Sequence, residues 1–186
     1  TLHMSLMGLR DLSIINTPPA DRIAIRTRLV HTNDTVIQEA VSRELRRQGQ
    51  VFVVHNRVET IFEYGRHLQR ILPQVRIAVA HGQMSEHQLE QLMLDFIEGR
   101  YDLLLSTTII ESGLDIPRAN TILINNADRF GLAQLYQLRG RVGRSNVQAF
   151  AYLMVLPEKI ISQTARDRLQ VWQDLNDLGV GFKRAS

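Results

Sequence analysis

The sequence lacks cysteine altogether and has very little lysine. Without cysteine, disulfide frameworks, cysteine-ligated zinc sites and thiol nucleophiles are excluded. Only Lys159 and Lys183 are lysines, and neither stands in the Gly-Lys-Ser/Thr context of a P-loop, so this chain has no P-loop. No apolar run approaches the roughly 20 residues that cross a bilayer, and no basic stretch followed by an apolar core marks a secretory signal. A cytoplasmic protein with no membrane partner is therefore expected.

The remaining composition is that of an ordinary globular chain. Of 186 residues 44% are hydrophobic and 22% are charged, enough for one domain with a full core and marginal for two. The net charge is only +3, but 20 of the 22 basic residues are arginine. Arginine suits phosphate and carboxylate partners, although a GC-rich genome would produce the same bias. Disorder is excluded by the apolar fraction and the small net charge.

Short apolar runs alternate with stretches of helical periodicity along the chain. The pattern predicts strands at 12–15, 23–30, 51–54, 75–80, 103–105, 121–124 and 150–156, and helices at 33–48, 58–72, 85–97, 132–138 and 160–176. Ser85, with Gln88 three residues later, has the pattern of a capping box. Apolar strands that alternate with helices predict an α/β fold, in which a parallel sheet carries helices on both faces.

Polar residues follow several of the predicted strands. Ligands of open parallel sheets bind at the carboxyl ends of the strands, so these segments are the first candidates for a site. The strand ends carry small hydroxyls, amides and guanidinium groups, which together suit a row of phosphates. The segments are 55–57, 81–84, 106–117 and 137–144.

The segment 137–144 is the most informative of the four. It reads Gln-Leu-Arg-Gly-Arg-Val-Gly-Arg, with three arginines separated by two glycines. The glycines let the backbone turn tightly, so the three guanidinium groups need not point the same way. This spacing favours a phosphate site, and the alternative is a solvated basic turn at a helix end.

These segments resemble the motifs of the C-terminal lobe of superfamily-2 helicases and translocases. Residues 137–144 are similar to motif VI, 107–117 to motif V, 53–57 to motif IV, and His81-Gly82 to the DNA-contacting motif between them. Within that superfamily, three stretches resemble the bacterial transcription-repair coupling factors: 1–19, 127–135 and 177–182.

The resemblance implies a RecA-like fold and three divisions of the chain. Residues 1–21 would be the end of an upstream lobe and a linker, and 22–157 the C-terminal RecA-like helicase lobe. Residues 158–186 would be the truncated start of a helical translocation hairpin, in which Trp172 is expected to pack.

The resemblance also implies a role in ATP hydrolysis. Arg141 and Arg144 would be arginine fingers that reach the γ-phosphate of ATP held by the upstream lobe, where such a group accelerates hydrolysis about 10³–10⁵-fold. Gln137 would sense the nucleotide, and Asp115 with Gly113 would approach its ribose or triphosphate. Mg²⁺ would arrive with ATP and be held by the other lobe, and no metal site is expected here, since the six histidines show no ligand spacing.

On the DNA side, hydroxyls and amides would contact the backbone of a duplex without reading its sequence. The residues implied are Asn56, Arg57, His81, Gly82, Gln83, Thr107 and Thr108. Two purely structural alternatives stay open. Thr107 and Thr108 cap a short helix at 109–111, or His81 merely closes a strand–helix turn. Arg43, Arg46 and Arg47 are interpreted as a solvated helix face.

The expected function is that of the second motor lobe of a double-stranded DNA translocase in transcription-coupled repair. Other domains of such a protein would meet stalled RNA polymerase and excision-repair proteins, and this chain alone would hydrolyse no ATP. The alternative within the superfamily is a RecG-type branch-migration helicase. From another class, a dinucleotide-binding module would need Gly-x-Gly-x-x-Gly, whereas Gly140 and Gly143 give only Gly-x-x-Gly.

Overall fold

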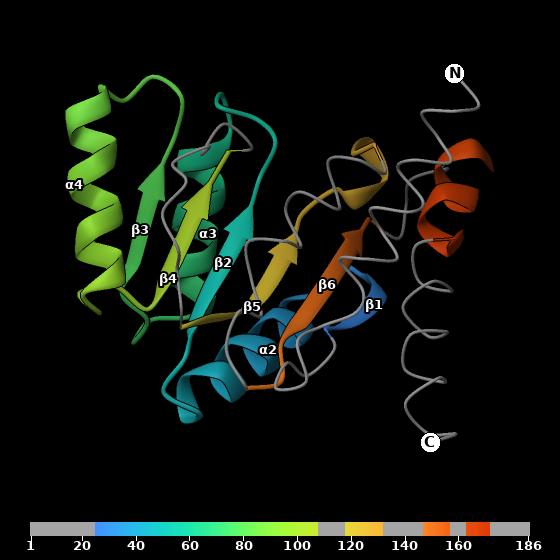
Figure 1. Cartoon of the computed structure of the whole chain (residues 1–186). Helices are drawn as coiled ribbons and strands as arrows, with labels where there is room; N and C mark the ends of the chain where they lie inside the picture. The colour runs from blue at the N-terminus through green and yellow to red at the C-terminus, as the bar shows by residue number, and fades with distance from the viewer. Residues whose placement is uncertain (1–24, 108–117, 132–146, 157–162, 172–186) are drawn as a thin grey trace, which may run out of the picture.

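Six parallel strands form one sheet in the computed structural model, which describes residues 25–107, 118–131, 147–156 and 163–171. All six arrows point the same way in Figure 1. The order across the sheet is β1-β6-β5-β2-β4-β3. The strands are β1 (Arg26–His31), β2 (Gln50–Val54), β3 (Ile77–Ala80), β4 (Leu103–Ser106), β5 (Ala119–Ile124) and β6 (Phe150–Val155).

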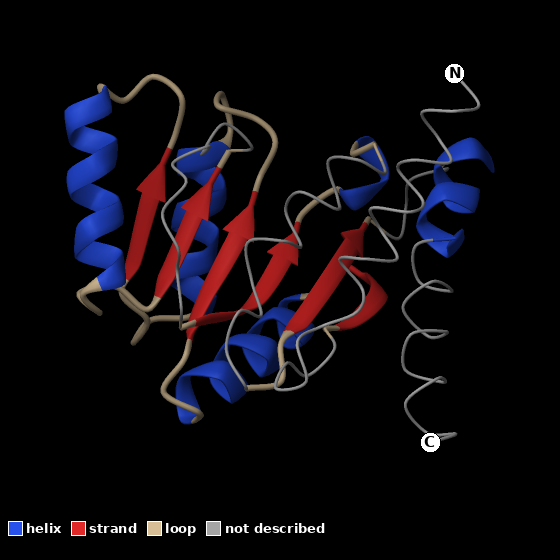
Figure 2. Ribbon diagram, viewed as in Figure 1, coloured by secondary structure: helices blue, strands red, loops and turns tan. Residues whose placement is uncertain are grey.

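Helices cover both faces of this sheet, as the sequence predicts (Figure 2). Successive side chains of a strand point to opposite faces, so β2 sends Val53 to one core and Phe52 to the other. The first core is completed by α2 (Asp34–Arg46) and α3 (Ile61–Ile71). The second is completed by α4 (Glu86–Ile97) and by Leu169 of the helical residues 163–171. The predicted α/β fold is therefore confirmed.

Local sequence signals set the beginnings of two helices. The Asn33 side chain accepts a hydrogen bond from the Thr35 backbone N–H at 2.7 Å and caps α2. At α4 the predicted capping box is confirmed. The Gln88 backbone N–H donates to Ser85 Oγ at 3.2 Å, and the Ser85 N–H donates to Gln88 Oε1 at 3.1 Å. Each such cap contributes about 1 kcal/mol to stability.

Five predicted boundaries were wrong by two or three residues: the starts of β1, β3, α3 and β5 and the end of α2. Helix α3 begins at Ile61 and not at residue 58, because residues 58–60 form the turn that leads the chain away from β2. Strand β5 begins at Ala119 and not at residue 121, because Ala119 pairs with Gln50 of β2. The polar Asn120 concealed this extension, although its side chain is buried.

The arginines of α2 correct another expectation. Arg46 is exposed, as predicted, but Arg43 and Arg47 are half-buried against β6. The Arg43 guanidinium lies 4.0 Å from the centre of the Phe150 ring and donates to the Tyr152 hydroxyl. Arg47 donates to the Gln148 carbonyl at 2.8 Å. These two side chains therefore attach α2 to the sheet through their guanidinium groups. The periodicity of the sequence does not predict such packing, because an arginine has the same position in the pattern whether it is solvated or packed.

Some predicted features lie outside the described residues. They are the strand at 12–15, the helix at 132–138, Trp172 and both division points, after residues 21 and 157. The helix predicted at 160–176 is confirmed over 163–171. Within the described parts of the chain, none of the helices is long and apolar enough to span a membrane.

Candidate nucleic-acid interface

β2 and β5 are neighbours in the sheet, and the segments that follow their carboxyl ends pack on opposite faces of it. After β2 the chain enters α3, which packs in one core. After β5 it enters the 3-10 helix η1 (Ala127–Arg129), and Ala127 and Phe130 pack in the other core. Open parallel sheets bind ligands at such a switch point. The topology therefore places this switch point beside the segments that the sequence singles out.

The described DNA-contact candidates gather at the carboxyl ends of three adjacent strands. Asn56 and Arg57 follow β2 and are exposed, and Thr107 follows β4. Residues 81–83 follow β3, with Gly82 and Gln83 exposed. The Thr107 backbone N–H donates to the Ala80 carbonyl at 3.3 Å, which joins two of these ends directly. Sequence positions far apart thus form one rim.

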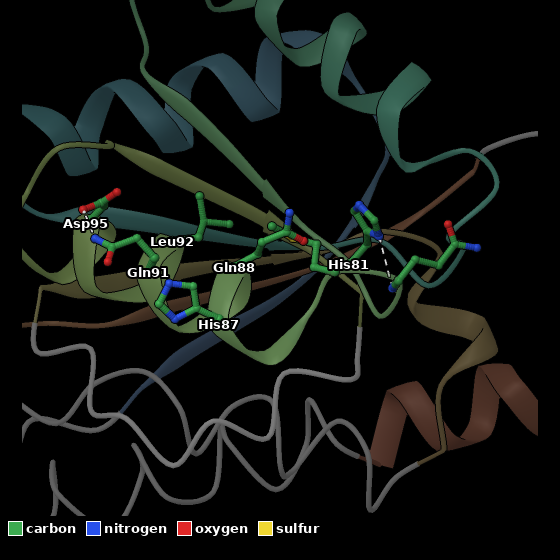
Figure 3. Close-up of a pocket in the computed structure, with 8 residues that line it drawn as sticks. His81, His87, Gln88, Gln91, Leu92 and Asp95 are labelled. Carbon is green, nitrogen blue, oxygen red and sulfur yellow. Dashed lines mark hydrogen bonds between the residues drawn. The ribbon is translucent and has the colours of Figure 1, made fainter.

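His81 closes the turn between β3 and α4, which is the structural role that the alternative interpretation gave it. Its Nδ1 accepts a hydrogen bond from the Gln83 backbone N–H at 3.2 Å, drawn as a dashed line in Figure 3. Its carbonyl also accepts from the Met84 N–H at 3.1 Å, so His81 does close the turn into α4. The ring is half-buried and meets the exposed Phe62 edge to face at 5.1 Å. Contact of His81 with DNA stays a prediction.

Thr107 is buried in this lobe, with 3% of its surface exposed. Its hydroxyl and that of Ser106 make no hydrogen bond in the described structure, although both are inaccessible to water. A buried hydroxyl without a partner costs about 1–3 kcal/mol, so both oxygens are available to a ligand that reaches them. The capping of residues 109–111 and the whole of Thr108 lie outside the described residues.

His55 lies at the centre of the same edge and is only 6% exposed. Its Nδ1 lies 2.9 Å from Asn125 Nδ2 and its Nε2 lies 2.7 Å from Thr60 Oγ1. The ring stacks on Tyr64 at 4.8 Å between centres. Burial, and secondarily the charge of Arg57, lowers the pKa of His55 below its usual 6.5. The imidazole is therefore neutral at physiological pH.

A groove of about 520 Å³ runs from the rim along α4 (Figure 3). His81 lies at one end of the groove and Asp95 at the other, with His87, Gln88, Gln91 and Leu92 between them. Gln83 and Met84 also line the groove. The lining is mixed polar and apolar, and among the described residues Asp95 is its only acidic side chain.

The candidates for the nucleotide side cannot be placed. Gly113, Asp115, Gln137, Arg141 and Arg144 all lie outside the described residues. Their roles therefore stay predictions. Among the residues that are described, no three or more His, Asp or Glu side chains are grouped so as to hold a metal ion.

Sequence reasoning placed His55 and Ser106 in segments at this edge without giving either residue a role, and it did not single out Asn125. Each stands at the end or directly after a strand that is buried throughout. A polar residue in that position has to find partners at the carboxyl edge, which is a signal the sequence does contain. What the sequence does not contain is the strand order, which decides that these three meet.

The fold and the motif order together define a class of protein. Residues 32–146 match the family described as "Helicase conserved C-terminal domain". The chain belongs to this family, which confirms the resemblance to helicase C-terminal lobes and favours a motor over a dinucleotide-binding module.

Relatives identify the narrower group. The chain is 57% identical over all 186 residues to a transcription-repair-coupling factor of Myxococcus xanthus and 53% identical over 185 residues to one of Staphylococcus aureus (strain USA300). It spans 16% of the length of each.

Solved structures agree with this placement. In "Structure of RecG bound to three-way DNA junction", a chain superposes with a TM-score of 0.71 at 37% identity over 87% of this chain and 22% of that one. The C-terminal domain of the DEAD-box protein Dbp5 superposes with a TM-score of 0.58 at 17% identity, covering 84% of this chain and 87% of that domain. The latter likeness concerns the fold alone, and the RecA-like helicase fold is confirmed.

Proposed function

We propose that this chain is the second motor lobe of an ATP-dependent double-stranded DNA translocase that displaces stalled RNA polymerase in transcription-coupled repair. The observation that carries the proposal is the 57% identity, over the entire chain, to part of a transcription-repair-coupling factor. The polar rim at the carboxyl ends of β2, β4 and β3 supports it, because it is an edge at which such a lobe could meet DNA.

On the nucleotide side, Arg141 and Arg144 act as arginine fingers toward ATP bound by a second RecA-like lobe. Negative charge spreads over the phosphoryl oxygens in the transition state, and a planar guanidinium stabilises it there. Gln137 senses the nucleotide, and Gly113 and Asp115 approach it from motif V. Mg²⁺ and the P-loop belong to the other lobe, so this chain alone hydrolyses no ATP.

On the DNA side, the exposed Asn56 and Arg57, with residues 81–83 and Thr107 and Thr108, follow the phosphate backbone. Such contacts position a duplex without reading its bases, and they weaken steeply with salt. RNA polymerase and excision-repair proteins are contacted by other domains of the longer protein, which works in the cytoplasm.

A second candidate is the corresponding lobe of a RecG-type branch-migration helicase. The superposition on a RecG chain at 37% identity favours it. The higher identity to the coupling factors over the whole chain favours the first candidate.

Arg141→Ala in the full-length protein tests the proposal. We expect DNA-stimulated ATP hydrolysis to fall by about 10³-fold or more, with duplex affinity nearly unchanged. Arg118→Ala is the matched control, since Arg118 is an exposed arginine beside the start of β5, at the opposite edge of the sheet. Wild-type turnover in Arg141→Ala would end the assignment of the finger.

A further inference from the structure

Three strand ends of the sheet meet at one buried residue, His55. Its own backbone N–H donates to the Ser106 carbonyl of β4 at 2.8 Å. Its ring meets Asn125, the residue after β5, and the Asn125 backbone N–H donates to the Val54 carbonyl of β2 at 2.9 Å. β2, β4 and β5 are thereby fixed to one another at their carboxyl ends.

The chemistry of the two ring contacts defines the state of the imidazole. The amide nitrogen of Asn125 donates to Nδ1, so Nδ1 carries no proton. The proton then resides on Nε2, which donates to the Thr60 hydroxyl on the turn before α3. The lowered pKa agrees with this neutral form. One ring therefore holds β5 on one side and the start of α3 on the other.

The residues that follow these strand ends belong to the DNA side and to the nucleotide side of the proposed function. Asn56 and Arg57 follow His55 directly, and Thr107 follows Ser106. Asn125 begins the segment that continues through η1 toward Gln137 and the arginines of motif VI. The Asn125–His55 bond therefore joins the end of β2 to the end of β5, beside the backbone hydrogen bond between Asn125 and Val54.

We propose that His55 is a positioning residue that couples DNA contact to ATP hydrolysis through its Nδ1 bond to Asn125. The inference rests on the proposed function, because it needs a DNA track on one side and a nucleotide site on the other. His55 itself touches neither ligand. Its removal should therefore reduce the stimulation of hydrolysis by DNA and leave basal hydrolysis and duplex affinity unchanged.

Two conservative variants separate coupling from packing. In His55→Asn the side-chain oxygen takes roughly the place of Nδ1 and still accepts from Asn125. In His55→Gln the amide nitrogen takes roughly the place of Nε2 and still donates to Thr60. Both lose the stack on Tyr64, so a merely structural role would affect the two equally.

The test measures basal and DNA-stimulated ATP hydrolysis in the full-length protein. We expect His55→Gln to lose about tenfold in stimulation, the scale of one buried hydrogen bond, and His55→Asn to stay within about threefold of wild type. Thr60→Val should retain the stimulation. His67→Asn is the control histidine variant, because His67 lies on α3 and its ring bonds to the exposed Asp34.

Asn125→Ser examines the same bond from its other side and keeps the test decisive if a His55 variant fails to fold. Asn125→Ser should lose as much DNA stimulation of ATP hydrolysis as His55→Gln. The double variant His55→Gln/Asn125→Ser should lose no more stimulation than either single variant. Equal losses in His55→Asn and His55→Gln, or full stimulation in His55→Gln or Asn125→Ser, overturn the inference. Absence of DNA stimulation in the wild-type protein would instead overturn the proposed function.

Discussion

The two edges of the sheet use their polar side chains differently. At the amino ends of the strands these groups bind one another: Glu44 Oε1 accepts from Arg47 at 2.7 Å and from the Thr121 hydroxyl at 2.6 Å. The Gln50 amide donates to two carbonyls, those of Phe96 and Tyr101. At the carboxyl ends His55 bonds to Asn125 and Thr60, but other polar side chains such as Arg57 are exposed. The Ser106 and Thr107 hydroxyls there are buried without a partner in the described structure.

This difference shows where the fold leaves polar groups available to a ligand. The amino edge also has a bidentate pair, in which Arg76 donates to both Asp102 oxygens. Glu44 Oε2, Arg47 Nε and, near the start of β1, Thr27 Oγ1 are its unpartnered buried atoms among the described residues. The amino edge therefore serves stability, and changes there should alter unfolding. We infer that the carboxyl edge serves binding, so changes there should alter contacts with DNA and nucleotide.

The largest effect on stability is expected from Glu44→Ala. The Glu44 side chain is fully buried, and its loss leaves the Thr121 hydroxyl without its partner. The loss also removes the carboxylate from the Arg47 guanidinium, which is 27% exposed and keeps its bond to the Gln148 carbonyl. We expect a loss of about 3 kcal/mol in the free energy of unfolding, measured by urea denaturation of this chain. Glu39→Ala, exposed on the same helix, should change it by less than about 0.5 kcal/mol. Similar values for the two variants would contradict the structural role of the amino edge.

A smaller effect, confined to DNA binding, is expected from Arg57→Ala. Arg57 is exposed at the carboxyl edge, and the loss of one phosphate contact should reduce the slope of log affinity against log salt by about 0.9. Arg70→Ala is the matched control, because Arg70 is exposed in the last turn of α3, toward the amino edge. Anisotropy of a labelled duplex at several salt concentrations measures both. Equal slopes for the two variants would remove the distinction between the edges.

The smallest effect concerns pH. Because the folded pKa of His55 lies below 6.5, the unfolded chain binds more protons between the two values. The free energy of unfolding should therefore fall as the pH drops from above 6.5 through the folded pKa. Urea denaturation at about pH 7.5 and about pH 5.5 measures the fall. His55→Asn should remove this component, and a variant that retains the full pH dependence would show that another group is responsible.

The sequence predicts the strands and helices because their apolar periodicity is strong, and it predicts the rim because residues 55–57 and 81–83 directly follow buried strands. It does not predict that Arg43 and Arg47 pack on β6, since an amphipathic guanidinium gives the same pattern whether it is solvated or stacked. Nor does it predict the meeting of His55 with Asn125. That contact depends on β5 pairing with β2, a long-range choice that no local pattern records.

Hydrogen exchange of the full-length protein with and without duplex DNA compares the two edges in one experiment. We expect DNA to slow exchange at residues 55–57, 81–84 and 106–107 and to leave residues 44–50 and 100–103 unchanged. Protection at the amino edge, or none at the carboxyl edge, would contradict the assignment of the carboxyl ends of the strands as the working face of this lobe.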